Sequence, residues 1–149
     1  MPGIMYRSMG GGPGFETGPT LFPPTMRHSA VSVQDDVLWV FWRNVGDAPE
    51  HMLVSSIALT PDWQAWQVSQ TFSLAPYEGA DEPVSPSLRS VAYGRQCQGR
   101  DPAIFEEGGQ IYLLYALARA SGIGLGQLFF DQNSQDPVDT TYRLHRSSN

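Results

Sequence analysis

The stretches Arg27-His28-Ser29-Ala30-Val31 and Arg100-Asp101-Pro102-Ala103-Ile104 decide how this chain of 149 residues is organised, because they open two copies of one repeat. Arg27 aligns with Arg100, an offset of 73 residues, and the alignment continues without a gap. It brings Leu38-Trp39-Val40-Phe41-Trp42 over Ile111-Tyr112-Leu113-Leu114-Tyr115. Few residues are identical, but the apolar and aromatic classes agree position by position.

The repeat extends beyond these two blocks. After a slip of two residues in the next turn, Val54 and Ile57 lie over Leu125 and Leu128. A repeat of this length predicts that each copy forms the same supersecondary unit.

Each copy predicts four antiparallel strands joined by short turns. In the first copy they are 29–33, 37–42, 51–59 and Trp66-Gln67-Val68; in the second they are 102–106, 110–116, 122–129 and Tyr142-Arg143-Leu144. The second strand of each copy is a continuous apolar run rather than an alternating one, which is typical of a strand buried on both faces.

Such strands favour the blades of a β-propeller over a sandwich, where one face of each sheet stays wet. We therefore predict one all-β domain of two four-stranded antiparallel blades. Its parts are an irregular lead-in or outer strand at 1–25, a first blade at 26–70, a long rim loop at 71–99 and a second blade at 100–145. Because propellers need about 4–8 blades to close, the open blade faces predict either a longer propeller or a homo-oligomer formed through those faces.

Composition excludes several function classes. The net charge of −6 comes from fifteen acids and nine Arg with no Lys, so no basic stripe is present and nucleic acid is not an expected partner. No apolar run approaches the ~20 residues of a membrane span, and the first 24 residues lack a signal-peptide layout, so we expect a soluble, cytoplasmic protein with no membrane partner. The single Cys97 excludes an internal disulfide.

The segments RDPAIFEE (100–107), IYLLY (111–115) and SGIG (121–124) resemble a blade of bacterial proteins related to glycoside hydrolase family 43. MRHSA (26–30) and GDAPEH (46–51) are similar to the same pattern. This resemblance implies a five-bladed propeller that acts on or binds carbohydrate, of which this chain supplies about two blades.

Blade geometry predicts where the polar residues meet. The first strand of a blade is innermost, so the starts of the two first strands should share one rim, with His28 and Asp101 at equivalent points of one funnel. We expect the substrate-binding residues Arg27, His28, Glu50 and Arg100 on this rim.

Glycoside hydrolysis needs one protonated and one ionised carboxyl group. Arg100 would keep its neighbour Asp101 ionised, which makes Asp101 the candidate for stabilising the transition state. Glu78 is the candidate acid, through the resemblance of its Glu-Gly context to that of the family. If the propeller is complete the protein would be a glycosidase; the alternative is a non-catalytic carbohydrate-binding or assembly module.

Structural roles for the same residues stay open. Asp101 would accept backbone N–H groups at the start of its strand, and the loop around Glu78 would be a solvated acidic loop. No cofactor is expected, apart from calcium held by Asp47, Glu50 and His51, whose spacing matches no recognised calcium loop. We expect Trp63 and Trp66 to be partly exposed.

Overall fold

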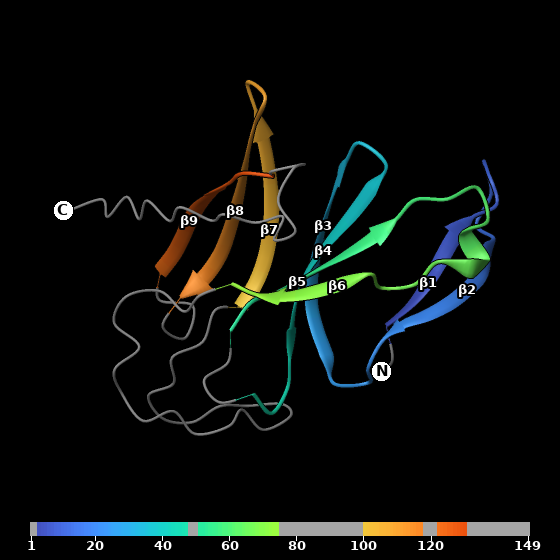
Figure 1. Cartoon of the computed structure of the whole chain (residues 1–149), viewed down its shortest axis with the longest axis horizontal. Coiled ribbons are helices and arrows are strands. Elements are labelled where there is room, and N and C mark those ends of the chain that lie inside the picture. The colour runs from blue at the N-terminus through green and yellow to red at the C-terminus, as the bar shows by residue number, and fades with distance from the viewer. Residues whose placement is uncertain (1–2, 48–50, 75–99, 118–121, 131–149) are drawn as a thin grey trace.

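The computed structural model describes residues 3–47, 51–74, 100–117 and 122–130, and these form an all-β protein. Its elements are β1 (Gly3–Ser8), β2 (Phe15–Phe22), β3 (Met26–Gln34), β4 (Val37–Asn44), β5 (Leu53–Ala58), the 3₁₀ turn η1 (Trp63–Ala65), β6 (Gln70–Ser73), β7 (Arg100–Glu107), β8 (Gln110–Leu117) and β9 (Gly122–Leu128). Three antiparallel sheets result: the N-terminal hairpin β1–β2, the central sheet β3–β6 and the C-terminal sheet β7–β9 (Figure 1). Within the described residues, no helix is long and apolar enough to cross a membrane.

Strand pairing shows that the two copies of the repeat have one register. Ala30 lies opposite Phe41 in the central sheet, and its equivalent Ala103 lies opposite Leu114 in the C-terminal sheet. The third strands, β5 and β9, follow the same rule once the slip of two residues is included. Val54 lies opposite Phe41 as Leu125 lies opposite Leu114. The alignment made from sequence is therefore confirmed at the level of cross-strand pairs.

The predicted fourth strand of the first copy was wrong. The segment 66–68 is irregular, and the strand that pairs with β5 is β6, at Gln70–Ser73. Trp66 and Val68 alternate as strand residues do, but both pack from the irregular segment against the cluster that includes Ile57. The fourth strand proposed for the second copy, at 142–144, lies outside the described residues.

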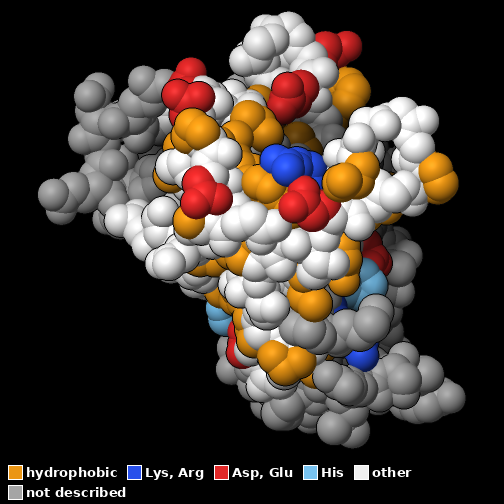
Figure 2. Space-filling model, turned by 90° about the vertical axis from the view of Figure 1, so that its right-hand side faces the viewer, with side chains coloured by type: hydrophobic (Ala, Val, Ile, Leu, Met, Phe, Trp, Pro, Cys, Tyr) orange, Lys and Arg blue, Asp and Glu red, His pale blue; other side chains and the backbone are white. Residues whose placement is uncertain are grey.

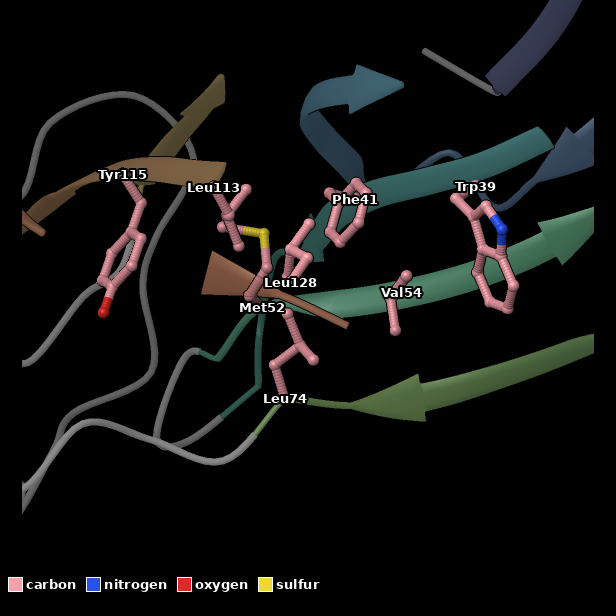
Figure 3. Packing of buried hydrophobic residues seen from close by; sticks show 8 residues of the cluster. All are labelled: Trp39, Phe41, Met52, Val54, Leu74, Leu113, Tyr115 and Leu128. Atoms are coloured by element: carbon pink, nitrogen blue, oxygen red, sulfur yellow. The ribbon is translucent and has the colours of Figure 1, made fainter. Parts of the chain in front are cut away.

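One hydrophobic cluster joins the central and C-terminal sheets. The central sheet and the segments flanking it contribute Trp39, Phe41, Met52, Val54 and Leu74, and the C-terminal sheet contributes Leu113, Tyr115 and Leu128 (Figure 3). Alternate residues of β4 thus face β7–β9. We call this side of the central sheet its back face.

A second cluster covers the opposite side of the central sheet, its front face. It consists of Leu38, Val40, Trp42 and Ile57 together with Phe22 of the hairpin. Because odd-numbered residues of β4 face one cluster and even-numbered residues the other, the run Leu38–Trp42 is buried on both faces, as its continuous apolar sequence predicts.

The interface between the hairpin and the central sheet and the interface between the central and C-terminal sheets have the same front-to-back orientation. Val40 and Trp42 on the front face of the central sheet are equivalent to Leu113 and Tyr115, which the C-terminal sheet turns toward the central sheet. The central sheet therefore presents its front face to the hairpin and its back face to the C-terminal sheet, which in turn presents its own front face to the central sheet.

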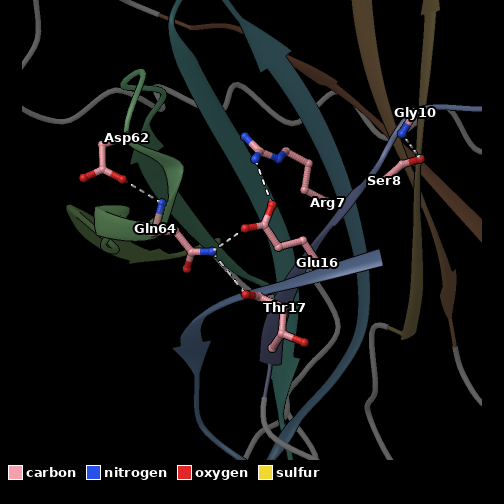
Figure 4. Close-up of polar contacts among 7 residues, drawn as sticks. All are labelled: Arg7, Ser8, Gly10, Glu16, Thr17, Asp62 and Gln64. Atoms are coloured by element: carbon pink, nitrogen blue, oxygen red, sulfur yellow. Dashed lines mark hydrogen bonds and ion pairs between the residues drawn. The ribbon is translucent and has the colours of Figure 1, made fainter. Parts of the chain in front are cut away.

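Polar contacts also attach the hairpin to the central sheet (Figure 4). The Arg7 guanidinium lies 4.5 Å from the ring centroid of Trp63 and forms an ion pair with Glu16 at 2.8 Å. Gln64 Nε2 donates to the carbonyl oxygen of Thr17 at 3.2 Å. Trp63 is buried, so its predicted exposure was wrong; Gly18 of β2 packs directly on its ring, a long-range contact that its polar neighbours in sequence do not reveal.

Candidate functional site

The first strands of the two copies carry the same irregularity near their starts. The register of β3 shifts between Arg27 and Ala30, and that of β7 shifts between Arg100 and Ala103. His28 and Asp101, inside these bulges, have φ angles of 42° and 52°. Left-handed backbone is uncommon for residues other than Gly, although Asp and His are enriched among the exceptions. Bulges re-aim side chains, and here they do so at the same point of both copies.

The two bulges bring His28 and Asp101 together. The imidazole Nδ1 of His28 contacts the carboxylate Oδ1 of Asp101, an interaction that is an ion pair when the imidazole is protonated. The side chains remain 41% and 54% exposed, so the pair is accessible to a ligand. At this exposure the contact adds little to stability.

A second polar contact joins β3 to β7 further along the strands. The buried Ser32 donates from Oγ to Glu106 Oε1 at 3.1 Å, and Gln34 Nε2 donates to Ser32 Oγ at 3.0 Å. Together with the His28–Asp101 pair, this contact joins β3 and β7, which lie side by side.

Two arginines face each other near the His28–Asp101 pair. Arg27 lies opposite Arg43 across β3 and β4, and the side chain of Arg43 is only 2% exposed. Sequence reasoning did not single out Arg43, because burial of an arginine on an apolar strand has no sequence signature.

The predicted site is only partly within the described residues. Arg100 begins β7 with its backbone opposite Ala116, and its side chain lies outside the description, as do the whole of Glu50 and Glu78. In the turn after β4, Asn44 Nδ2 donates to Asp47 Oδ1 at 2.8 Å. Among the described residues, no group of three or more His, Cys, Asp or Glu could hold a metal ion, and Glu50 of the predicted calcium site lies outside them.

A cleft of about 1010 Å³ lies at the other end of the two sheets, near the β3–β4 and β7–β8 turns. Its lining combines the aromatic rings of Trp39, Phe129 and Phe130 with amide groups such as those of Gln34 and Gln110. The carboxylates of Asp35 and Asp36 also line it. Because Gln34 ends β3 and His28 lies near its start, the cleft and the His28–Asp101 pair are at opposite ends of the strands.

Comparisons with known proteins give one relative. No protein-family model and no solved structure matches the chain. An uncharacterised protein of Acanthamoeba polyphaga mimivirus is 32% identical over 108 residues, which cover 69% of this chain and 30% of the viral protein. The chain thus spans less than a third of the length of that relative.

Proposed function

We propose that this chain supplies two neighbouring blades of a glycoside-hydrolase-like β-propeller and that His28 and Asp101 bind the hydroxyl groups of a carbohydrate. The observation that carries the proposal is their contact, made by equivalent bulges of two successive repeats. The propeller is supported by the stacking of two antiparallel sheets of one register, in which the back face of the central sheet packs on the front face of the C-terminal sheet. The matched region is 30% of the length of the viral relative, so a protein of that length has room for further blades.

The chemistry of the pair suits a sugar. A carboxylate accepts hydrogen bonds from neighbouring hydroxyl groups, and an imidazole either donates or accepts one. The contact between the two side chains restrains both, so less ordering is required when a ligand binds. The pair also lies where two sheets meet, a common place for a ligand site.

A binding test uses 4-nitrophenyl furanosides and pyranosides, with calorimetry as the measurement. Asp101→Asn keeps the size of the side chain and removes its charge, so we expect at least a tenfold loss of affinity for whichever glycoside binds. Glu106→Gln is the matched control, because Glu106 also joins β3 to β7 but lies away from the bulges. Equal losses in both variants, or none in either, would overturn the assignment of the pair.

Hydrolysis is the second candidate, favoured by the sequence Arg100-Asp101-Pro102. In that case Asp101 stays ionised and stabilises the positive charge of the transition state, and Glu78 donates the proton. Release of 4-nitrophenol that is abolished by Asp101→Asn and by Glu78→Gln supports catalysis. Binding without release, in the chain and in any longer natural form, identifies a non-catalytic carbohydrate module instead.

A further inference from the structure

The cleft between the central and C-terminal sheets has the size of a small-molecule site. Its volume of about 1010 Å³ is at the upper end of the range of roughly 300–1,000 Å³ that is usual for such sites. Two hairpin turns border it, residues 35–36 between β3 and β4 and residues 108–109 between β7 and β8, and both lie at one end of the stacked sheets (Figure 1). The His28–Asp101 pair is near the other end of the strands, so the cleft is a separate place on the molecule.

Part of the lining of the cleft is aromatic. The rings of Trp39 and Phe130 lie with their centroids 5.1 Å apart in a tilted arrangement, one from the central sheet and one from the segment after β9. Phe129 adds a third ring, which is 48% exposed and therefore accessible to a ligand. Aromatic rings provide a large apolar contact area, and their faces also attract cations because the π electrons place negative charge there.

The charged residues of the described lining are all acidic. Asp35 and Asp36 are both exposed, and the other described residues of the lining are apolar, amide, hydroxyl or glycine residues. Arg and His do not occur in the described lining, and the chain contains no Lys. The local charge of the cleft is therefore negative, which favours a cationic ligand over a neutral or anionic one.

The two bordering turns differ in residue type although they are equivalent in the repeat. Asp35 has a φ angle of 53°, and Gly108, its equivalent at the offset of 73 residues, has one of 59°. Glycine adopts this left-handed backbone freely, whereas Asp does so less readily. The first copy thus carries two adjacent carboxylates where the second copy has two glycines. Within the described lining, the charge of the cleft therefore comes from the turn of the central sheet alone.

We propose that the cleft binds a small organic cation, with its ammonium group at the carboxylates of the β3–β4 turn and its apolar body on the aromatic rings. Charge and apolar area select such a ligand together. The carboxylates hold the ammonium group through charge-assisted hydrogen bonds, and the rings remove the apolar body from water. A metal ion lacks the apolar body, and a neutral aromatic compound lacks the charge. The proposal does not depend on the carbohydrate assignment, because the His28–Asp101 pair lies near the opposite end of the strands.

Three probes of similar size test the proposal by calorimetry at neutral pH: the cation phenethylamine, the neutral 2-phenylethanol and the anion phenylacetate. We expect the wild-type chain to bind the amine about tenfold more tightly than the alcohol, and the anion more weakly than either. Asp36→Asn should reduce this preference for the amine, and the double variant Asp35→Asn/Asp36→Asn should abolish it. Asn tolerates the left-handed backbone at position 35 as Asp does. Phe129→Ala should weaken the binding of the amine and of the alcohol alike, because both lose apolar contact area.

A matched control is needed because acidic side chains also lie elsewhere on the surface. Figure 2 looks onto the side of the hairpin and shows them there among hydrophobic ones. Asp62→Asn removes one exposed charge outside the cleft, as Asp36→Asn removes one inside it. The Asn side chain keeps an oxygen that can accept from the backbone N–H of Gln64, as Asp62 does (Figure 4). This control should leave the preference for the amine unchanged.

Other outcomes overturn the proposal. Equal binding of the amine and the alcohol to the wild-type chain would mean that charge does not select the ligand, and no binding of any probe at millimolar concentration would mean that the cleft is not such a site. Equal losses of preference in Asp36→Asn and Asp62→Asn would assign the preference to the net charge of −6 instead of the cleft. Unchanged affinities in Phe129→Ala would remove the rings from the site. Urea unfolding of each variant establishes that a loss of binding is not a loss of folding.

Discussion

The central and C-terminal sheets share one register and differ in their surroundings. At equivalent positions of the two second strands, Phe41 is fully buried whereas Leu114 is only partly buried. The central sheet has the hairpin on its front face and the C-terminal sheet on its back, and the C-terminal sheet is covered on its front face (Figure 1). Burial in this protein therefore follows from the place of a sheet in the stack as much as from its own sequence.

The strongest test of this difference truncates equivalent residues. Phe41→Ala should lower the free energy of unfolding by about 3–5 kcal/mol, because it leaves a cavity between two sheets. Leu114→Ala should cost about half as much or less, because solvent already reaches this side chain. Urea unfolding, performed at concentrations where the chain is monomeric, measures both. Equal losses would show that the face of the C-terminal sheet that carries Leu114 is covered in solution.

Close packing of an aromatic ring on glycine distinguishes the C-terminal sheet in a second way. Tyr115 lies opposite Gly124, where an added Cβ would be 2.6 Å from Cζ of the ring, whereas the equivalent pair of the central sheet is Trp42 and Leu53. Gly124→Ala should therefore destabilise the protein by about 1–3 kcal/mol.

A double-mutant cycle checks the cause of this loss. Combining Gly124→Ala with Tyr115→Leu, which shortens the side chain above the new methyl group, should recover part of the stability. Strictly additive free energies would mean that the ring and the glycine do not act on each other.

The smallest expected effect is on pH dependence. Burial raises the pKa of the Tyr115 phenol above that of a solvated phenol, so the folded state holds its proton at a pH where the unfolded chain has lost it. The contribution of this group to the free energy of unfolding is therefore fully present below pH ~10. Above that pH it decreases, by at most about 1.4 kcal/mol per pH unit. Tyr115→Phe should reduce the alkaline loss seen in urea unfolding. The equivalent residue of the central sheet, Trp42, does not titrate, and an unchanged profile would assign the loss to other groups.

Sequence alone predicts the repeat and its pairing because apolar class and spacing are local properties. The slip of two residues between β4 and β5 is an example: it appears in the alignment and again in the pairing of Val54 and Leu125. The prediction of the fourth strand was wrong because Trp66 and Val68 alternate in the same way in a strand and in an irregular segment that packs on a core.

The candidate site was likewise predictable from the sequence only in part. Repeat equivalence placed His28 and Asp101 in one funnel, and the structure brings them into contact, whereas their functional roles stay predictions. The burial of Trp63 could not be foreseen, since it depends on Gly18, which is distant in sequence. The aromatic and amide cleft at the other end of the sheets also arises only when the two copies are stacked.

The order of the strands has a consequence for how the chain folds. In each sheet every strand pairs with its neighbour in sequence, so hairpins form by closing short loops at low entropic cost. Contacts between β3 and β7, such as Ser32 with Glu106, join residues 74 apart in sequence and require two sheets to meet. We therefore expect the hairpins of each sheet to form before the sheets dock, with docking as the slower step.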